Sequence, residues 1–460
     1  MNLSEKKLKS SVLNLSGFGD FGFTLFVNVE LYYWAAFLTD YARFSVATAT
    51  LILTLTSVID CIWVPITGWL IEKSNFKWGK YRSWLVIGPP IMIFTYALEF
   101  SRIGSSEMVA AAIVIAAFSI KTLAQDLAYS ASVSLVSDLS NIQEERMTLA
   151  ARRGQFLSLG NIVFSVIALP LITWLAKVSG NEILGYSLAA IIFGILNFIC
   201  YYVAFSVTKG CSVSGSGGQE ESKAPAQKLS FSQMLKAVFA NPPLFVLIVA
   251  DSFRYLAYFL MSAAAYYYFV VVLGDLPAMT TYLVITRIIG YIGSSFANMT
   301  AKKLGKKTAY LGSLVIMILS LVLCFFFGRT VWSFIFFHIF VNFFQQITMS
   351  TLTALLADTV IYYQWKTSVD ARGFIMSMLN VPIKVGAILR STILGAGLAM
   401  AGYVANTAPT ASQIRGISML MNLYPAVFLV FTVVIFGIGY RLNEGKIESM
   451  TSEINARKQA

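Results

Sequence analysis

The sequence predicts an all-helical membrane protein with about twelve transmembrane helices in two six-helix halves, and three observations carry this prediction. Of the 460 residues, 57% are hydrophobic and only 12% are charged, far from the composition of an ordinary soluble domain. Apolar runs near the ~20 residues needed to cross a ~30 Å hydrocarbon core recur along the chain. A Gly- and Ser-rich stretch divides six of these runs from six others.

Each predicted helix is an apolar run, and short polar connections separate the runs. The expected spans are 20–41, 46–71, 83–101, 107–135, 153–177, 182–206, 240–273, 277–300, 308–328, 330–357, 372–403 and 413–441. The first run contains Asp20 and Glu30 and no small-residue cleavage site, so we expect a retained helix and not a cleavable signal peptide.

The stretch 207–232 is rich in Gly, Ser and charge and can bury almost nothing, so it predicts a flexible cytoplasmic linker. The predicted organisation is therefore an N-terminal bundle over 1–206, this linker, a C-terminal bundle over 233–441 and a cytoplasmic tail over 442–460.

The formal net charge of the chain is +12, and the positions of its basic residues along the chain argue against nucleic-acid binding. About 24 of the 34 Lys and Arg fall in the tails and in every second connection, and about five fall on the other side. The positive-inside rule then predicts a multi-pass protein of the cell inner membrane with both termini in the cytoplasm. The remaining basic residues lie within predicted helices: Lys121, Arg254, Arg287, Lys384 and Arg390.

A faint internal repeat appears at three places in the same order, with an offset of roughly 220 residues. The matched segments are 78–85 with 304–311, 135–138 with 356–358, and 151–158 with 370–377. Three matches in order favour two homologous six-helix halves. This is the major-facilitator plan, in which the binding cavity lies between the halves near mid-membrane.

Several strings resemble those of the glycoside-pentoside-hexuronide:cation symporter family, to which the melibiose carrier belongs. They are Gly17–Gly22, Ile59-Asp60 with Pro65–Trp69, Trp78–Trp84, Glu145-Arg146 with Arg153, and Ala357-Asp358 with Lys384-Val385-Gly386. The similarity spans most of the chain. It implies a monomeric secondary transporter of a small sugar that works by alternating access in the lipid bilayer, and neither an enzyme nor a holder of a metal or cofactor.

One departure from the family pattern bears on the coupling ion. The family has two carboxylates four residues apart on helix 2, which can ligate Na⁺ by oxygen, whereas here Val64 follows Asp60. If Lys384 approaches Asp60, as the resemblance implies, the pair is already neutral. We therefore expect proton coupling in preference to sodium coupling. Glu30 is a second candidate proton site, since burial favours the protonated carboxyl.

Candidate substrate-binding groups are the charges retained in hydrocarbon and the polar or aromatic side chains near them, because sugars bind by hydrogen bonds and ring stacking. They are Asp20, Thr24, Trp63, Lys121, Asp126, Tyr129, Arg153 and Gln346. Asp20 and Thr24 are one helical turn apart on the same face. Lys121 and Asp126 are five residues apart, so we expect each to have a separate partner or to contact substrate.

Basic residues of the cytoplasmic turns and acidic residues at helix ends suggest ion-pair latches that differ between conformations. The candidate gating residues are Lys80, Arg82, Asp138, Asp358 and Arg372. The basic residues also hold the loops inside, which is an alternative role for them. Arg254 and Asp251 are expected to form a structural bridge.

Three other functions remain open on the sequence. An uncoupled facilitator is one, because Val64 removes a coupling ligand. A transporter of a non-sugar organic anion or of a lipid is another. A membrane enzyme or receptor is disfavoured, because no nucleophile–base set and no phosphate-binding loop is found in the sequence.

Overall fold

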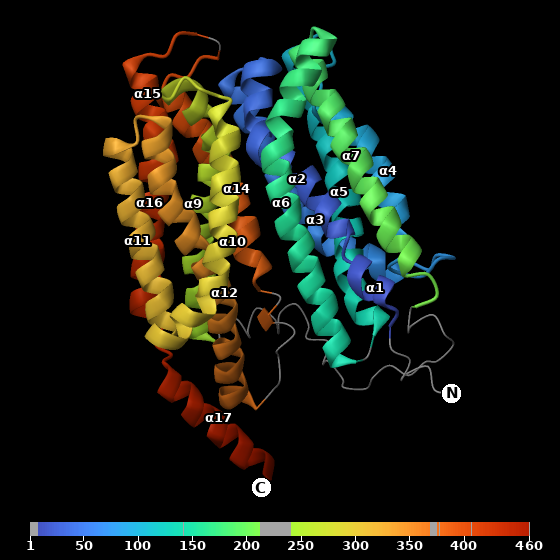
Figure 1. The fold of residues 1–460 in the computed structure, drawn as a ribbon, viewed down its shortest axis with the longest axis vertical. Helices are drawn as coiled ribbons and strands as arrows, with labels where there is room; N and C mark the ends of the chain where they lie inside the picture. The colour runs from blue at the N-terminus through green and yellow to red at the C-terminus, as the bar shows by residue number, and fades with distance from the viewer. Residues whose placement is uncertain are drawn as a thin grey trace. The chain divides into compact units, whose positions relative to one another are not determined.

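The computed structural model describes residues 8–140, 142–211, 241–368, 375–376, 378–405 and 407–459. Every regular element in these ranges is a helix. By their contacts the described residues form two compact units, the first drawn from 1–221 and 403–408 and the second from 222–402 and 409–460. Figure 1 shows the first unit from blue to green and most of the second from yellow to red.

The first unit contains six long helical segments and one short helix. They are α1 (Ser10–Leu15), α2 (Gly19–Ala36) continued by the π-helical η2 (Phe37–Tyr41), α3 (Val46–Lys73), α4 (Trp84–Glu99), α5 (Glu107–Leu139), α6 (Gln143–Ser179) and α7 (Glu182–Val207).

The second unit contains six long helical segments and a terminal helix. It contains α9 (Pro242–Tyr267) continued by η3 (Tyr268–Val272), α10 (Ala278–Leu304), α11 (Lys306–Phe327), α12 (Val331–Thr367), α14 (Asn380–Met400), the series α15 (Ala411–Ser418), η4 (Met419–Leu423) and α16 (Tyr424–Gly439), and the terminal α17 (Glu444–Gln459).

Ten of these segments are long and apolar enough to cross a membrane, α4 is a shorter apolar helix, and α10 is 27 residues long. Together they are the twelve segments that the sequence predicts. Several extend beyond the predicted spans, because polar residues continue a helix outside the bilayer as readily as apolar ones. α12, for example, runs for 37 residues, which is roughly 55 Å against a ~30 Å hydrocarbon core.

The packing pattern confirms the internal repeat. In the first unit α2 packs against α6 and α7, α5 packs against α3 and α4, and α4 packs against α7. In the second unit α9 packs against α14 and α16, α12 packs against α10 and α11, and α11 packs against α16. These five helix pairs of the first unit therefore each have a counterpart in the second.

The predicted linker 207–232 lies mostly outside the described residues, and so does Arg372. The predicted tail forms α17 over most of its length, where Glu453 accepts a hydrogen bond from the Trp365 indole at 2.7 Å. In the second unit the Asp251–Arg254 bridge is confirmed: Arg254 is fully buried, and its Nη2 lies 3.1 Å from Asp251 Oδ2. Tyr310 donates to the same carboxylate at 3.1 Å.

Candidate functional site

Close helix packing sets the position of Asp20 at the start of α2. A Cβ atom at Gly17 would lie 2.7 Å from Arg153 Cγ, and one at Gly160 would lie 2.9 Å from the Phe21 carbonyl oxygen. Only glycine allows such an approach between the α2 region and α6. Asp20, in the first turn of α2, is thereby held against Arg153 of α6.

Asp20 and Arg153 form a two-fold hydrogen-bonded ion pair. Arg153 Nη2 donates to Asp20 Oδ1 at 2.8 Å, and its Nε donates to the other carboxylate oxygen. The Asp20 side chain is fully buried, while 13% of the Arg153 side chain is exposed. Paired donors on a planar guanidinium match both oxygens of a carboxylate, so this pair is geometrically specific.

Two stacked aromatic rings lie beside this ion pair. The rings of Phe23 and Tyr129 are 4.3 Å apart at 17°, and the Arg153 guanidinium carbon lies 5.9 Å from the centre of the Tyr129 ring. Thr24 donates its hydroxyl to the Asp20 carbonyl at 2.8 Å, so that hydroxyl is engaged with the α2 backbone. The sequence-predicted residues Asp20, Thr24, Tyr129 and Arg153 are thus brought together within the first unit.

A second charged cluster lies further along α2. Lys121 of α5 donates to Glu30 of α2, and its ammonium lies 3.4 Å from Glu99 Oε2 at the end of α4. The side chains of Lys121 and Glu99 are fully buried, and 18% of the Glu30 side chain is exposed. The expectation that Lys121 has a partner other than Asp126 is confirmed.

Glu99 was not singled out in the sequence. The sequence does carry a sign of its importance, because Glu99 is the one charged residue among the sixteen of α4. Asn28 and Asn161 were also missed. The Asn28 side chain of α2 donates a hydrogen bond to the Asn161 side chain of α6 at 3.0 Å. Asn28 lies less than one helical turn before Glu30 on α2.

The other predicted site residues are spread over both units. Asp60, Trp63 and Asp126 belong to the first unit, and Lys384 and Gln346 to the second. Asp60 lies on α3 with the exposed Val64, and Gln346 packs near Gly290 of α10. A shared site for these residues, and the Asp60–Lys384 pair, stay predictions.

The gating candidates have varied surroundings. Lys306 forms an ion pair with Asp358 at 2.7 Å in the second unit. In the first unit Arg82 donates to the Phe205 carbonyl at 2.7 Å and to the Thr208 hydroxyl at 3.1 Å, which ties its loop to the end of α7. Lys80 lies near the Tyr81 ring, and Asp138 is buried close to the end of α5. Their gating roles stay predictions.

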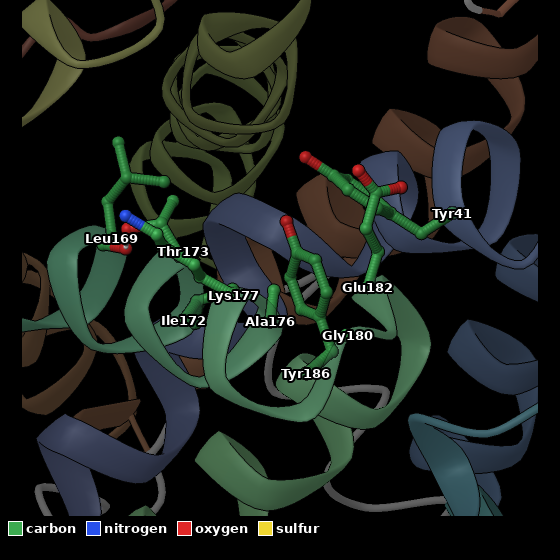
Figure 2. A pocket seen from close by; sticks show the side chains of 9 residues that line it. All are labelled: Tyr41, Leu169, Ile172, Thr173, Ala176, Lys177, Gly180, Glu182 and Tyr186. Carbon is green, nitrogen blue, oxygen red and sulfur yellow. Dashed lines mark hydrogen bonds between the residues drawn. The ribbon is translucent and has the colours of Figure 1, made fainter.

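Two surface hollows of the first unit are lined by other residues. One, of about 400 Å³, sits where α6 turns into α7 and is lined by Lys177, Gly180, Glu182 and Tyr186 among others (Figure 2). The other, of about 600 Å³, is lined by Thr39, Arg43, Glu107 and Tyr403 among others. No predicted site residue lines either hollow, so neither is taken as the candidate site.

Comparison with known proteins gives a consistent set of similarities. A family model described as MFS/sugar transport protein matches residues 15–444. A protein of Escherichia coli (strain K12) whose name proposes that it imports sulfoquinovose is 26% identical over 444 residues, covering 96% of this chain and 93% of that protein. The isoprimeverose transporter of Lactiplantibacillus pentosus is 25% identical over 407 residues, covering 87% and 82%.

Solved structures resemble the chain at lower identity. A bacterial homolog of the human lysosomal transporter Spinster has a TM-score of 0.69 at 13% identity, covering 94% of this chain and 96% of that one. The nucleoside transporter NupG has a TM-score of 0.61 at 13% identity, covering 93% and 99%. At this identity the likeness concerns the fold alone.

Proposed function

The chain belongs to the family of MFS/sugar transport proteins, and we propose on this premise that it carries a sugar across the cytoplasmic membrane by alternating access, coupled to protons in preference to sodium. The family identifies a multi-pass membrane transporter, not an enzyme, and the expected major-facilitator fold is confirmed. The substrate, the coupling ion, the monomeric state and the cytoplasmic position of both termini are parts of the proposal.

The Asp20–Arg153 pair beside the Phe23–Tyr129 stack carries the assignment of the sugar site. A carboxylate accepts hydrogen bonds from sugar hydroxyls, a guanidinium donates to them, and an aromatic ring stacks on the C–H face of a sugar. All three kinds of group meet within one helix turn of α2. The Arg153 side chain is partly exposed, unlike that of Asp20, so it is the member of the pair that an incoming ligand would contact first.

An anionic sugar is the second candidate substrate, favoured by the same arginine. Relatives of the chain are named for sulfoquinovose and for glucuronide. A sulfonate or carboxylate of the substrate would compete with Asp20 for the two donors of Arg153, since planar arginine recognises such groups bidentately. A lipid or a non-sugar anion is the substrate class that would be left if none of the sugars in the panel below is taken up.

The coupling proposal depends on the count of carboxylates on α3. Asp60 has no second carboxylate one turn away, because Val64 stands there and presents only methyl groups. A hard cation such as Na⁺ needs several oxygen ligands, whereas a proton needs one carboxyl group. The proposed coupling ion is therefore the proton and not sodium.

The test is uptake by the full-length protein reconstituted in vesicles. The panel contains methyl glucoside, isoprimeverose, methyl glucuronide and sulfoquinovose, each measured with and without a proton gradient and with Na⁺ varied. Proton-driven uptake of at least one sugar supports the proposal. Uptake of none of the four, or uptake that follows a sodium gradient at constant pH, contradicts it. Uptake of a sugar that follows neither ion favours an uncoupled facilitator.

A further inference from the structure

The buried cluster of Glu30, Lys121 and Glu99 holds an unequal number of charges. Three helices, α2, α5 and α4, each contribute one of its members. Two carboxyl groups share one ammonium, so with all three ionised the cluster would carry one excess negative charge. An uncompensated buried charge is very costly, and a carboxyl group avoids the cost by binding a proton.

The geometry identifies Glu99 as the member that binds this proton. Lys121 makes its hydrogen bond to Glu30, while Glu99 Oε2 stands 3.4 Å away. Both side-chain oxygens of Glu99 are buried without a hydrogen-bond partner, and its side chain is fully enclosed. Glu99 is also the last residue of α4, where the negative end of the helix dipole disfavours a carboxylate.

No other charged group among the described contacts offsets Glu99. Tyr96 on the same helix donates its hydroxyl to the Phe26 carbonyl at 2.8 Å. On α5, Lys121 lies over the ring of Phe118 at 4.3 Å. α7, which also packs against α4, contributes Tyr186, whose ring stacks on the neighbouring Phe100. The charged groups that face Glu99 are thus Lys121 and, beyond it, Glu30.

We propose that Glu99 is a proton-binding site, with Lys121 as the counter-ion that it shares with Glu30. Glu30 is the partly exposed member and so the point at which a proton enters the cluster. On losing its proton, Glu99 competes with Glu30 for Lys121, and the ammonium moves toward α4. Proton binding at Glu99 is argued from the contacts alone, whereas its use in coupling rests on the proposed function.

The cluster is connected to the candidate sugar site through α2. Glu30 follows Asp20 by ten residues, which is about 15 Å along one helix. A change in the pairing of Glu30 therefore acts on the same rigid element that holds Asp20 against Arg153. This offers a coupling route inside the first unit, separate from the predicted Asp60–Lys384 pair.

The first experiment detects the proton without any sugar. Infrared difference spectra of the purified full-length protein in lipid nanodiscs, recorded across a pH series in H₂O and D₂O, report the C=O stretch of protonated carboxyl groups. We expect a D₂O-sensitive band in the wild type that Glu99→Gln abolishes. Glu182→Gln, which changes an exposed glutamate at the start of α7, serves as the matched control and retains the band. A band unchanged in Glu99→Gln overturns the proposal.

A second variant keeps the test decisive if Glu99→Gln does not yield folded protein. Lys121→Gln removes the shared cation and leaves two buried carboxyl groups, so the protonated-carboxyl band is expected to increase. An unchanged band in Lys121→Gln overturns the proposal as well.

Transport then separates the two proposals. With sulfoquinovose and methyl glucuronide as probes, Glu99→Gln is expected to lose accumulation driven by a proton gradient and to retain sugar exchange across the vesicle membrane. Gradient-driven accumulation that persists in Glu99→Gln overturns the coupling role of Glu99. A wild type that shows the band and transports none of the sugar panel contradicts the proposed function and leaves proton binding at Glu99 supported.

Discussion

Arg153 and Asp20 are joined by two hydrogen bonds that use Nε and Nη2 of the guanidinium and both oxygens of the carboxylate, with Nη2 to Oδ1 at 2.8 Å. The pair links α6 to α2 over 133 residues of sequence. Asp20 is fully buried, so the pair is a fixed feature of the first unit and not a surface contact. In the proposed sugar site, it is the contact that a bound sugar would share or displace.

The first prediction concerns this geometry. Arg153→Lys keeps the charge and loses the paired donors, so we expect strongly reduced sugar uptake with the protein still folded. Asp20→Asn leaves Arg153 without its counter-charge and should lower stability by at most the ~3–5 kcal/mol of a broken buried pair, since Arg153 is partly exposed. Uptake and the apparent melting temperature in detergent measure the two effects.

The matched control is Arg152→Lys, because the neighbouring Arg152 is exposed and contacts only Gln155 among the described hydrogen bonds. Equal losses of uptake in Arg152→Lys and Arg153→Lys would contradict a specific role for the pair.

A second prediction tests the close approach of α2 and α6. Gly160→Ala would bring a methyl group to 2.9 Å from both the Phe21 carbonyl oxygen and Thr24 Cβ, and we expect a loss of about 1–3 kcal/mol through overpacking. Gly154→Ala on the same helix meets nothing within 4 Å and should be neutral or stabilising by up to ~1 kcal/mol. An equal decrease in melting temperature for Gly160→Ala and Gly154→Ala would refute the packing argument.

A third prediction concerns the Lys306–Asp358 ion pair. Its lysine is one-third exposed, so removing the pair should change stability by no more than ~1 kcal/mol. If the pair is a conformational latch, Lys306→Asp and Asp358→Lys each slow or unbalance uptake, and the exchanged double variant restores it. Lys303→Gln, at an exposed position in the last turn of α10, is the control. Normal uptake in both single variants would show that the ion pair has no gating role.

A fourth prediction concerns the coupling ion. Wild-type uptake should depend on the proton gradient and be indifferent to Na⁺, and Val64→Asp should introduce stimulation by Na⁺, because it places a second carboxylate one turn from Asp60. Ile62→Asp provides the control, since two residues from Asp60 its carboxylate points to a different face of α3. Sodium stimulation of the wild type at constant pH, or equal stimulation in the two variants, would show the argument to be wrong.

The lengths of the apolar runs predicted the twelve segments, and three pairs of matched strings predicted the internal repeat, before any contact was known. Both depend on local properties, namely the number of apolar residues needed to span a bilayer and the similarity of matched strings. Helix ends were less well predicted. α6 and α12 begin or end ten residues beyond their expected spans, because helical hydrogen bonds continue into water without an apolar sequence signal.

The sequence by itself also determined which residues were costly to bury, since Asp20, Glu30, Lys121 and Arg153 stand out as charges in or near apolar helices. Only the tertiary structure decided which of them are partners. Asp20 with Arg153, and Lys121 with Glu30 and Glu99, are joined across different helices, and spacing along one helix says nothing about the rotation and depth of its neighbours. Pairing of buried charges is a property of how helices pack, and therefore it appears only when they are assembled.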